Sequence, residues 1–140
     1  MQSIFVETKG ELDVVNVTNL LQQSVSGLGS GLLHVFLKST TSGLYVNEDD
    51  PALIEDIRDF IKRSAPSDAR YRHDTTWGDG NGRSHVRSLL LDRSLLIPVS
   101  RGSLALGTWQ SVFLVELDTR PRRRELVLTF IKADRRWKNP

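Results

Sequence analysis

Residues 31–38 constrain the fold more than any other segment, because five of these eight side chains are apolar. So short an apolar run is typical of a strand buried inside a sheet. Other segments with strand patterns fall at residues 3–8, 11–15, 43–47, 94–99, 104–118 and 125–132. Strands therefore dominate the C-terminal half of the chain.

Two helices are predicted between these strands. The first begins after Asn16, an expected N-cap, and ends at the glycines of residues 27–29. The second begins at residues 49–51, where carboxylates and a proline favour a helix start, and its apolar stripe runs to Ile61. Residues 85–91 predict a short third helix or a turn. This irregular alternation of strands with about three helices indicates an α+β fold whose sheets are mostly antiparallel or mixed.

The composition favours one globular domain. A chain of 140 residues buries a single core, expected here over residues 1–132, with a basic tail at residues 133–140. The absence of cysteine excludes disulfides, thiolate zinc sites and a catalytic cysteine. No apolar run reaches the roughly 20 residues of a membrane span, and no signal peptide is apparent, so we expect a cytoplasmic protein without a membrane partner. The net charge of +2 is small, and basic runs are usually solvated, so nucleic acid is not an expected partner.

Residues 71–85 form the segment that points most directly to function. This segment is polar, has three glycines, and contains His73 and His85, two of the three histidines. A compact domain seldom orders such a loop without a use for it. Imidazoles transfer protons or bind metals near neutral pH, and glycine lets backbone approach a ligand closely. The segment therefore predicts a site for an anion or a metal. The alternative is two exposed histidines held by local hydrogen bonds.

Three segments together resemble the YjbQ family. They are residues 39–48 (Ser-Thr-Thr to Asn-Glu), residues 71–85, and residues 104–118 with the sequence Leu-Gly-Thr-Trp-Gln. The resemblance covers nearly the whole chain. It implies a compact α+β domain with a sandwich-like core, a homotrimer, and a weak thiamine-phosphate synthase activity.

The resemblance also implies a polar site gathered from these segments. His73 and His85 with a carboxylate from Glu48 or Asp79 would suit a divalent ion such as zinc or magnesium. Glu48 could instead act as a general base. Ser39 stands where family members commonly carry a histidine, and serine is a poor zinc ligand compared with imidazole. This departure argues against a three-histidine metal site.

Further side chains are expected to bind the ligand. The candidate positions are Ser39, Thr40, Thr41, Asn47, Asp79, Asn81, Thr108, Trp109 and Gln110. Threonine hydroxyls would bind phosphate oxygens, and Trp109 would stack on a flat ring. Residues 47–50 could equally cap the following helix, and Trp109 could equally pack in the core. Glu116 lies in an apolar strand and needs a partner, for which Arg87 and Arg101 are candidates.

Two functions compete on this evidence. The first is a transferase that joins a pyrimidine diphosphate to a thiazole phosphate and releases pyrophosphate, with His73, His85 and Glu48 as catalytic groups. The second is a non-catalytic protein that binds a phosphorylated or anionic metabolite, or a metal, as a homo-oligomer. A third possibility is a structural oligomer in which residues 71–85 only contact other subunits. Saturable turnover separates the first from the second.

Overall fold

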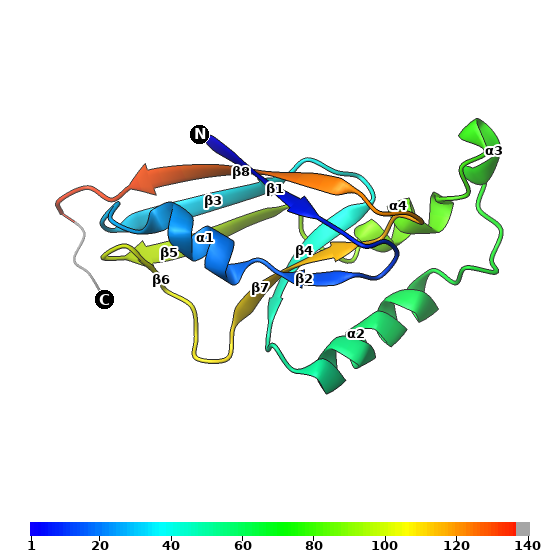
Figure 1. The fold of residues 1–140 in the computed structure, drawn as a ribbon, viewed down its shortest axis with the longest axis horizontal. Coiled ribbons are helices and arrows are strands. Elements are labelled where there is room, and N and C mark those ends of the chain that lie inside the picture. Colours follow the sequence, from blue (N-terminus) through cyan, green and yellow to red (C-terminus); the bar gives the residue numbers. More distant parts are fainter. Residues whose placement is uncertain (137–140) are drawn as a thin grey trace.

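The computed structural model describes residues 1–136, which form four helices and eight strands (Figure 1). In chain order these are β1 (Gln2–Glu7), β2 (Val14–Asn16), α1 (Thr18–Val25), β3 (Gly31–Leu37), β4 (Ser42–Asn47), α2 (Pro51–Ser64), α3 (Asp74–Trp77), α4 (Gly82–Ser88), β5 (Ser94–Ser100), β6 (Ser103–Leu104), β7 (Ser111–Glu116) and β8 (Arg123–Lys132). The predicted basic tail begins within this range, but Trp137 and the residues after it lie outside the described residues.

The strands form two antiparallel sheets that share one core. The larger sheet has the order β1-β8-β3-β5-β6, and the smaller has the order β2-β7-β4. Alternate side chains of both sheets point inward and pack with α1. Fully buried leucines from the two sheets and from α1 fill this core, namely Leu21, Leu33, Leu37, Leu44, Leu114 and Leu126. The prediction of a single α+β domain with a sandwich-like core is therefore confirmed.

Strand β8 lies inside the larger sheet, between β1 and β3. It pairs with β1 on one side, where Gln2 lies opposite Leu128, and with β3 on the other, where Val35 also lies opposite Leu128. The first and last strands of the chain are thus neighbours. Figure 1 shows α2, α3 and α4 gathered at one end of the molecule, away from the C-terminal end of β8.

The outer face of the larger sheet is rich in exposed apolar side chains. Phe36 is 42% exposed, Leu96 58% and Ile131 53%. His34 lies in the same face, opposite Leu96, and its ring nitrogen Nε2 is 2.6 Å from the Ser94 hydroxyl. Within residues 1–136, no helix packs over this face, which we call the outer face.

Two predicted strands are corrected by the structure. The second strand begins at Val14 rather than at residue 11, because Leu12 adopts a left-handed φ of 63° in a turn. The strand predicted at residues 104–118 is two strands with a loop between them. That loop turns because the Gln110 side chain accepts a hydrogen bond from the Gly107 amide at 2.8 Å, and the Gln110 amide donates to the Gly107 carbonyl at 3.0 Å.

The helices also differ from the prediction. There are four rather than about three, because α3 forms inside the predicted polar loop, and α4 begins at Gly82 rather than at residue 85. Asp50 caps α2 by accepting a hydrogen bond from the Leu53 amide at 3.0 Å. Asn16 accepts from the Thr18 amide at the start of α1, one residue before the N-cap position itself. None of the described helices has the length and apolar character that a membrane span requires.

Candidate functional site

The structure divides the predicted site residues between opposite ends of the smaller sheet. The antiparallel register of β4 with β7 places Ser42 opposite Glu116, and Asn47 opposite Ser111. Residues 39–41 therefore lie at one end of this sheet. Asn47, Glu48 and the loop of residues 105–110 lie at the other end. A single chain does not bring all the predicted residues into one site.

The end that holds Asn47 has the character of a helix-capping segment. The Asn47 side chain accepts a hydrogen bond from the Glu48 amide at 2.8 Å, and the Glu48 side chain is exposed. Asp49 accepts from the Asn16 side-chain amide at 2.9 Å. These contacts support the capping alternative. Trp109 is 72% exposed, so the structure contradicts the alternative that it packs in the core, and Thr108 and Gln110 beside it are exposed too.

At the opposite end the two loop histidines are in contact. The ring centroids of His73 and His85 are 4.4 Å apart, with an angle of 69° between the ring planes. Gly82 makes this approach possible, because a Cβ atom there would lie 2.6 Å from the Tyr71 Cβ and 2.8 Å from an oxygen of Asp74. The Gly82 amide instead donates to Asp74 at 2.8 Å. The loop that carries His73 is thereby fastened to the start of α4, which carries His85.

The surroundings of His85 favour a neutral imidazole. Burial lowers the pKa of His85, and the neighbouring His73 lowers it further. The carboxylates of Asp118 and Asp79, together with a hydrogen bond to the Thr40 backbone, oppose this shift without reversing it. A neutral imidazole keeps one nitrogen as a hydrogen-bond acceptor. His85 can therefore accept a proton near neutral pH.

His85 lies on the wall of a cleft of about 680 Å³ between α4, β8 and the segment that follows β3. Ser39, Thr40, Thr41 and Asn81 also line it. The structure therefore brings these five predicted site residues together around one cleft. His73 lines an adjacent hollow that shares His85, whereas Asp79 lies exposed on the loop between α3 and α4.

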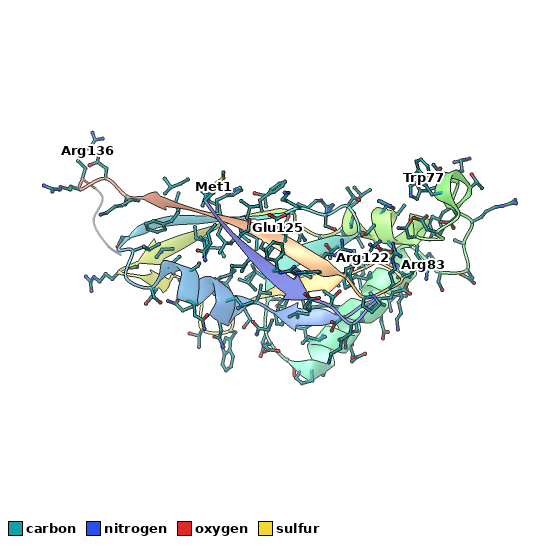
Figure 2. All side chains as sticks on the ribbon, turned by 45° about the horizontal axis from the view of Figure 1, so that its top comes forward. Met1, Trp77, Arg83, Arg122, Glu125 and Arg136 are labelled. Atoms are coloured by element: carbon teal, nitrogen blue, oxygen red, sulfur yellow. The ribbon has the colours of Figure 1, made fainter. Side chains whose placement is uncertain are left out.

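Four cations and one carboxylate line the cleft. The cations are Lys38, Arg93, Arg122 and Arg124, and the carboxylate is Asp118. Figure 2 shows Arg122 at the end of the molecule that carries α4. Lys38, Arg93 and Asp118 were not predicted from the sequence as site residues. The spacing of Glu116 and Asp118 before Arg122 and Arg124 was the signal that could have indicated Asp118.

Asp118 is an ionised carboxylate inside the wall of the cleft. Burial raises its pKa, but hydrogen bonds from the Thr119 amide and from Arg122 outweigh burial and hold the pKa of Asp118 below its usual value. Arg122 donates to Asp118 from Nε at 2.9 Å, and the Asn81 side-chain amide donates to it at 3.5 Å. Asn81 is only 5% exposed, so it belongs to the wall rather than to the open space.

Glu116 finds its partner in Arg124, and neither Arg87 nor Arg101 pairs with it. Arg124 donates from Nε at 2.8 Å and from Nη2 at 2.5 Å, and it also donates to the Thr41 hydroxyl at 2.8 Å. The prediction of Arg87 or Arg101 was wrong because the chain crosses from the smaller sheet to the larger between Glu116 and Arg124. Arg87 instead binds Glu11, 2.9 Å away.

The protein side chains near the histidine pair form an incomplete set of metal ligands. Among residues 1–136, no cluster of three or more histidine, aspartate or glutamate side chains is placed to hold a metal ion. Glu48, one of the two predicted carboxylate ligands, lies at the other end of β4 from the histidines. A typical zinc site takes three or four protein ligands, so His73 and His85 would fill only two of its positions.

The structure is that of a small α+β protein with two packed antiparallel sheets and a histidine pair at one end. The chain belongs to the YjbQ family, because residues 2–133 match the family model described as "UPF0047 protein YjbQ-like". The family resemblance of the sequence is therefore confirmed over nearly the whole chain.

Individual relatives agree with this assignment. The UPF0047 protein of Methanothermobacter thermautotrophicus is 36% identical over 127 residues, which cover 89% of this chain and 87% of that protein. YjbQ of Salmonella typhimurium is 36% identical over 117 residues, covering 81% and 84% of the two chains.

Solved structures agree as well. A YbjQ-like protein of unknown function from Sulfolobus solfataricus has a TM-score of 0.85 at 30% identity, with 92% of this chain and 94% of that chain covered. An uncharacterized YjbQ/UPF0047 protein from Clostridium acetobutylicum has a TM-score of 0.84 at 30% identity, with 94% and 100% covered.

Proposed function

We propose that the cleft beside His85 binds a small anionic ligand, such as a phosphorylated metabolite. The observation that carries this proposal is one uncompensated cation on its wall: three of the four cations pair with carboxylates, but Arg93 does not within the described residues. Clustered cations raise the local concentration of anions and supply charge-assisted hydrogen bonds to them. Exposed hydroxyl and backbone groups of Thr40 lie on the same wall and add polar contacts.

Arg93 strengthens this argument because its charge lacks a carboxylate partner. Its guanidinium donates to the Ser42 carbonyl at 3.2 Å and to the Ser88 carbonyl at 2.6 Å. Within the described part of the chain it forms no ion pair. A buried or half-buried cation that contacts only neutral oxygens favours the binding of an anion beside it.

A titration with inorganic phosphate tests the proposal. We expect Arg122→Gln to weaken phosphate binding by about tenfold, which corresponds to about 1.4 kcal/mol for one charge-assisted contact. Arg123→Gln is the matched control, because Arg123 is the next residue, pairs with Glu7 and stacks on Phe5 away from the cleft. Equal binding by both variants, or no binding by the unaltered protein, would refute the proposal.

A transferase of the thiamine-phosphate synthase kind is our second candidate. It is favoured by the contact between His73 and His85, since a neutral imidazole with a lowered pKa accepts a proton at neutral pH. In such a reaction the cations of the cleft would stabilise the departing pyrophosphate. Release of pyrophosphate from a pyrimidine diphosphate and a thiazole phosphate is the measurement. Turnover that His85→Ala does not reduce would exclude His85 as the catalytic group.

We separately propose that a divalent ion binds at the histidine pair. Its remaining ligands would be groups other than the described side chains. Elemental analysis of the purified protein, with zinc added back, tests it. We expect one metal ion per chain, lost in both His73→Ala and His85→Ala. A protein that takes up no zinc would end this proposal and leave the anion site unaffected.

We also propose that the chain assembles into a homo-oligomer, a trimer by the family resemblance, through the outer face. Exposed apolar side chains on one sheet face are typical of subunit contacts. We expect Leu96→Glu to reduce the mass measured by light scattering to that of one chain, whereas Leu89→Glu, at the exposed residue that follows α4, leaves it unchanged. A monomeric mass for the unaltered protein would contradict the proposal.

A further inference from the structure

Glu11 lies in the turn after β1, on the opposite side of α4 from the cleft. Its Oε1 accepts hydrogen bonds from Arg83 Nε at 2.8 Å and from Arg87 Nη1 at 2.9 Å. Its Oε2 accepts from Arg83 Nη2 at 3.0 Å. One carboxylate thus holds two side chains of the same short helix.

The two arginines occupy positions on α4 that flank His85. Arg83 and Arg87 are four residues apart, so they share one face of the helix, and His85 lies two residues from each. Residues two apart on a helix project about 200° from each other. The ion pairs therefore lie on the face of α4 opposite the imidazole. A rotation of α4 that broke them would turn His85 out of the cleft.

Arg87 makes this attachment rigid. Its side chain is 2% exposed, and its Nε also donates to the Ala65 carbonyl at the end of α2. Arg83 has a further bond from Nη1 to the Gly80 carbonyl at 3.1 Å. Buried guanidinium groups with several fixed partners lose little entropy for each added bond, so this geometry is well determined.

Glu11 is itself held in place by the backbone of its turn. Leu12 has a positive φ of 63°, and its amide donates to the Glu116 carbonyl at 2.7 Å. The hydrogen bonds from Arg83, supported by the nearby charge of Arg87, lower the pKa of Glu11, so the carboxylate stays ionised near neutral pH. The turn after β1 therefore provides a fixed anchor for α4.

We infer that Glu11 is a positioning residue, which fixes the rotation of α4 and so holds His85 against His73 and in the cleft. This inference deepens the proposed function and rests on it where ligand binding is concerned. A residue that lies outside the cleft thus controls the orientation of the imidazole inside the cleft. Glu11 itself makes no contact with the ligand.

The test compares Glu11→Gln with Glu55→Gln. Glu55 lines the same hollow behind α4, but its ion pair is with Arg58 on α2 rather than with an arginine of α4. Nuclear magnetic resonance gives the pKa of His85, and a phosphate titration gives the affinity of the cleft. Circular dichroism confirms that each variant keeps the fold.

We expect Glu11→Gln to raise the pKa of His85 towards its ordinary value, because a looser helix exposes the ring and separates it from His73. Phosphate affinity should fall by about threefold to tenfold, whereas Glu55→Gln should leave both quantities unchanged. If Glu11→Gln does not fold, Arg83→Gln removes two of the three bonds to Glu11 and serves in its place.

An unchanged pKa of His85 together with unchanged affinity in the folded variant would overturn the inference. If the unaltered protein binds no phosphate, the proposed function fails, but the titration of His85 still decides whether Glu11 positions it. The two failures are therefore distinguishable.

Discussion

Glu116 and Arg124 form a two-point ion pair that joins the smaller sheet to the larger. The Glu116 side chain is completely buried and that of Arg124 is 11% exposed. Thr8, at the end of β1, donates its hydroxyl to the same carboxylate at 2.7 Å. Strands from both sheets therefore meet at one buried carboxylate beside the cleft.

Removing one partner of this pair should destabilise the protein strongly. We expect Glu116→Ala to lower the free energy of unfolding by about 3–5 kcal/mol, because it leaves a nearly buried guanidinium without its counter-charge. Chemical denaturation measures the loss. Glu125→Ala is the control, since Glu125 pairs with a half-exposed Lys38 and should cost less than about 1 kcal/mol. Similar losses of unfolding free energy in both variants would show that the buried ion pair stabilises the protein no more than the exposed pair does.

Gly82→Ala should separate the two histidines. The new Cβ would collide with the Tyr71 Cβ at 2.6 Å, so the loop that carries His73 must move away from α4. The nuclear Overhauser contact between the two imidazole rings should disappear while most of the core signals persist. Val86→Ala, on the exposed side of the same helix, should keep the contact. A preserved contact in Gly82→Ala would mean that the loop tolerates the extra methyl group.

Replacing His73 with asparagine should raise the pKa of His85, because a neighbouring positive charge is removed. A titration of the imidazole signals measures this change. In the unaltered protein the folded-state pKa of His85 lies below its ordinary value of 6.5, so the unfolded chain binds the proton more tightly. Its contribution to stability is therefore complete above that value and is lost as the pH falls below it. His85→Asn should flatten this part of the stability profile.

Trp109→Ala should leave phosphate binding and the titration of His85 unchanged. Trp109 precedes β7, and the cleft lies beyond the other end of that strand. Calorimetry with phosphate measures the binding. A large loss of affinity would show that a second copy of the chain brings its own Trp109 to the cleft, which light scattering on the same variant can examine.

The sequence predicted the strands and the sheet class well because their signal is local. β3 follows directly from its apolar run, and α2 follows from Pro51, the Asp50 cap and the apolar stripe. The loop at residues 105–110 was missed because Thr108 and Trp109 have good strand propensity. A side-chain bond from Gln110 back to the Gly107 amide decides the turn, and propensity does not report it.

The candidate site was predicted only in part, because its assembly depends on pairing between distant segments. His73 and His85 are in contact, although their spacing in the sequence alone did not predict it. Asn47 and Trp109 were grouped with them, but the antiparallel register places these two at the far end of the same strands. The hydrogen bonds between Glu11 and α4 join residues more than 70 positions apart in the sequence. No local sequence pattern predicts such contacts.

The position of β8 between β1 and β3 has a consequence for how the chain reaches its native state. β1 and β3 are completed long before β8 leaves the ribosome, yet each uses β8 as its neighbour. Both strands therefore keep an unpaired edge until residues 123–132 are synthesised, and pairing between such distant segments is intrinsically slow. We expect a nascent chain arrested before Arg123 to be digested readily by protease, and the same chain extended through residue 132 to resist it.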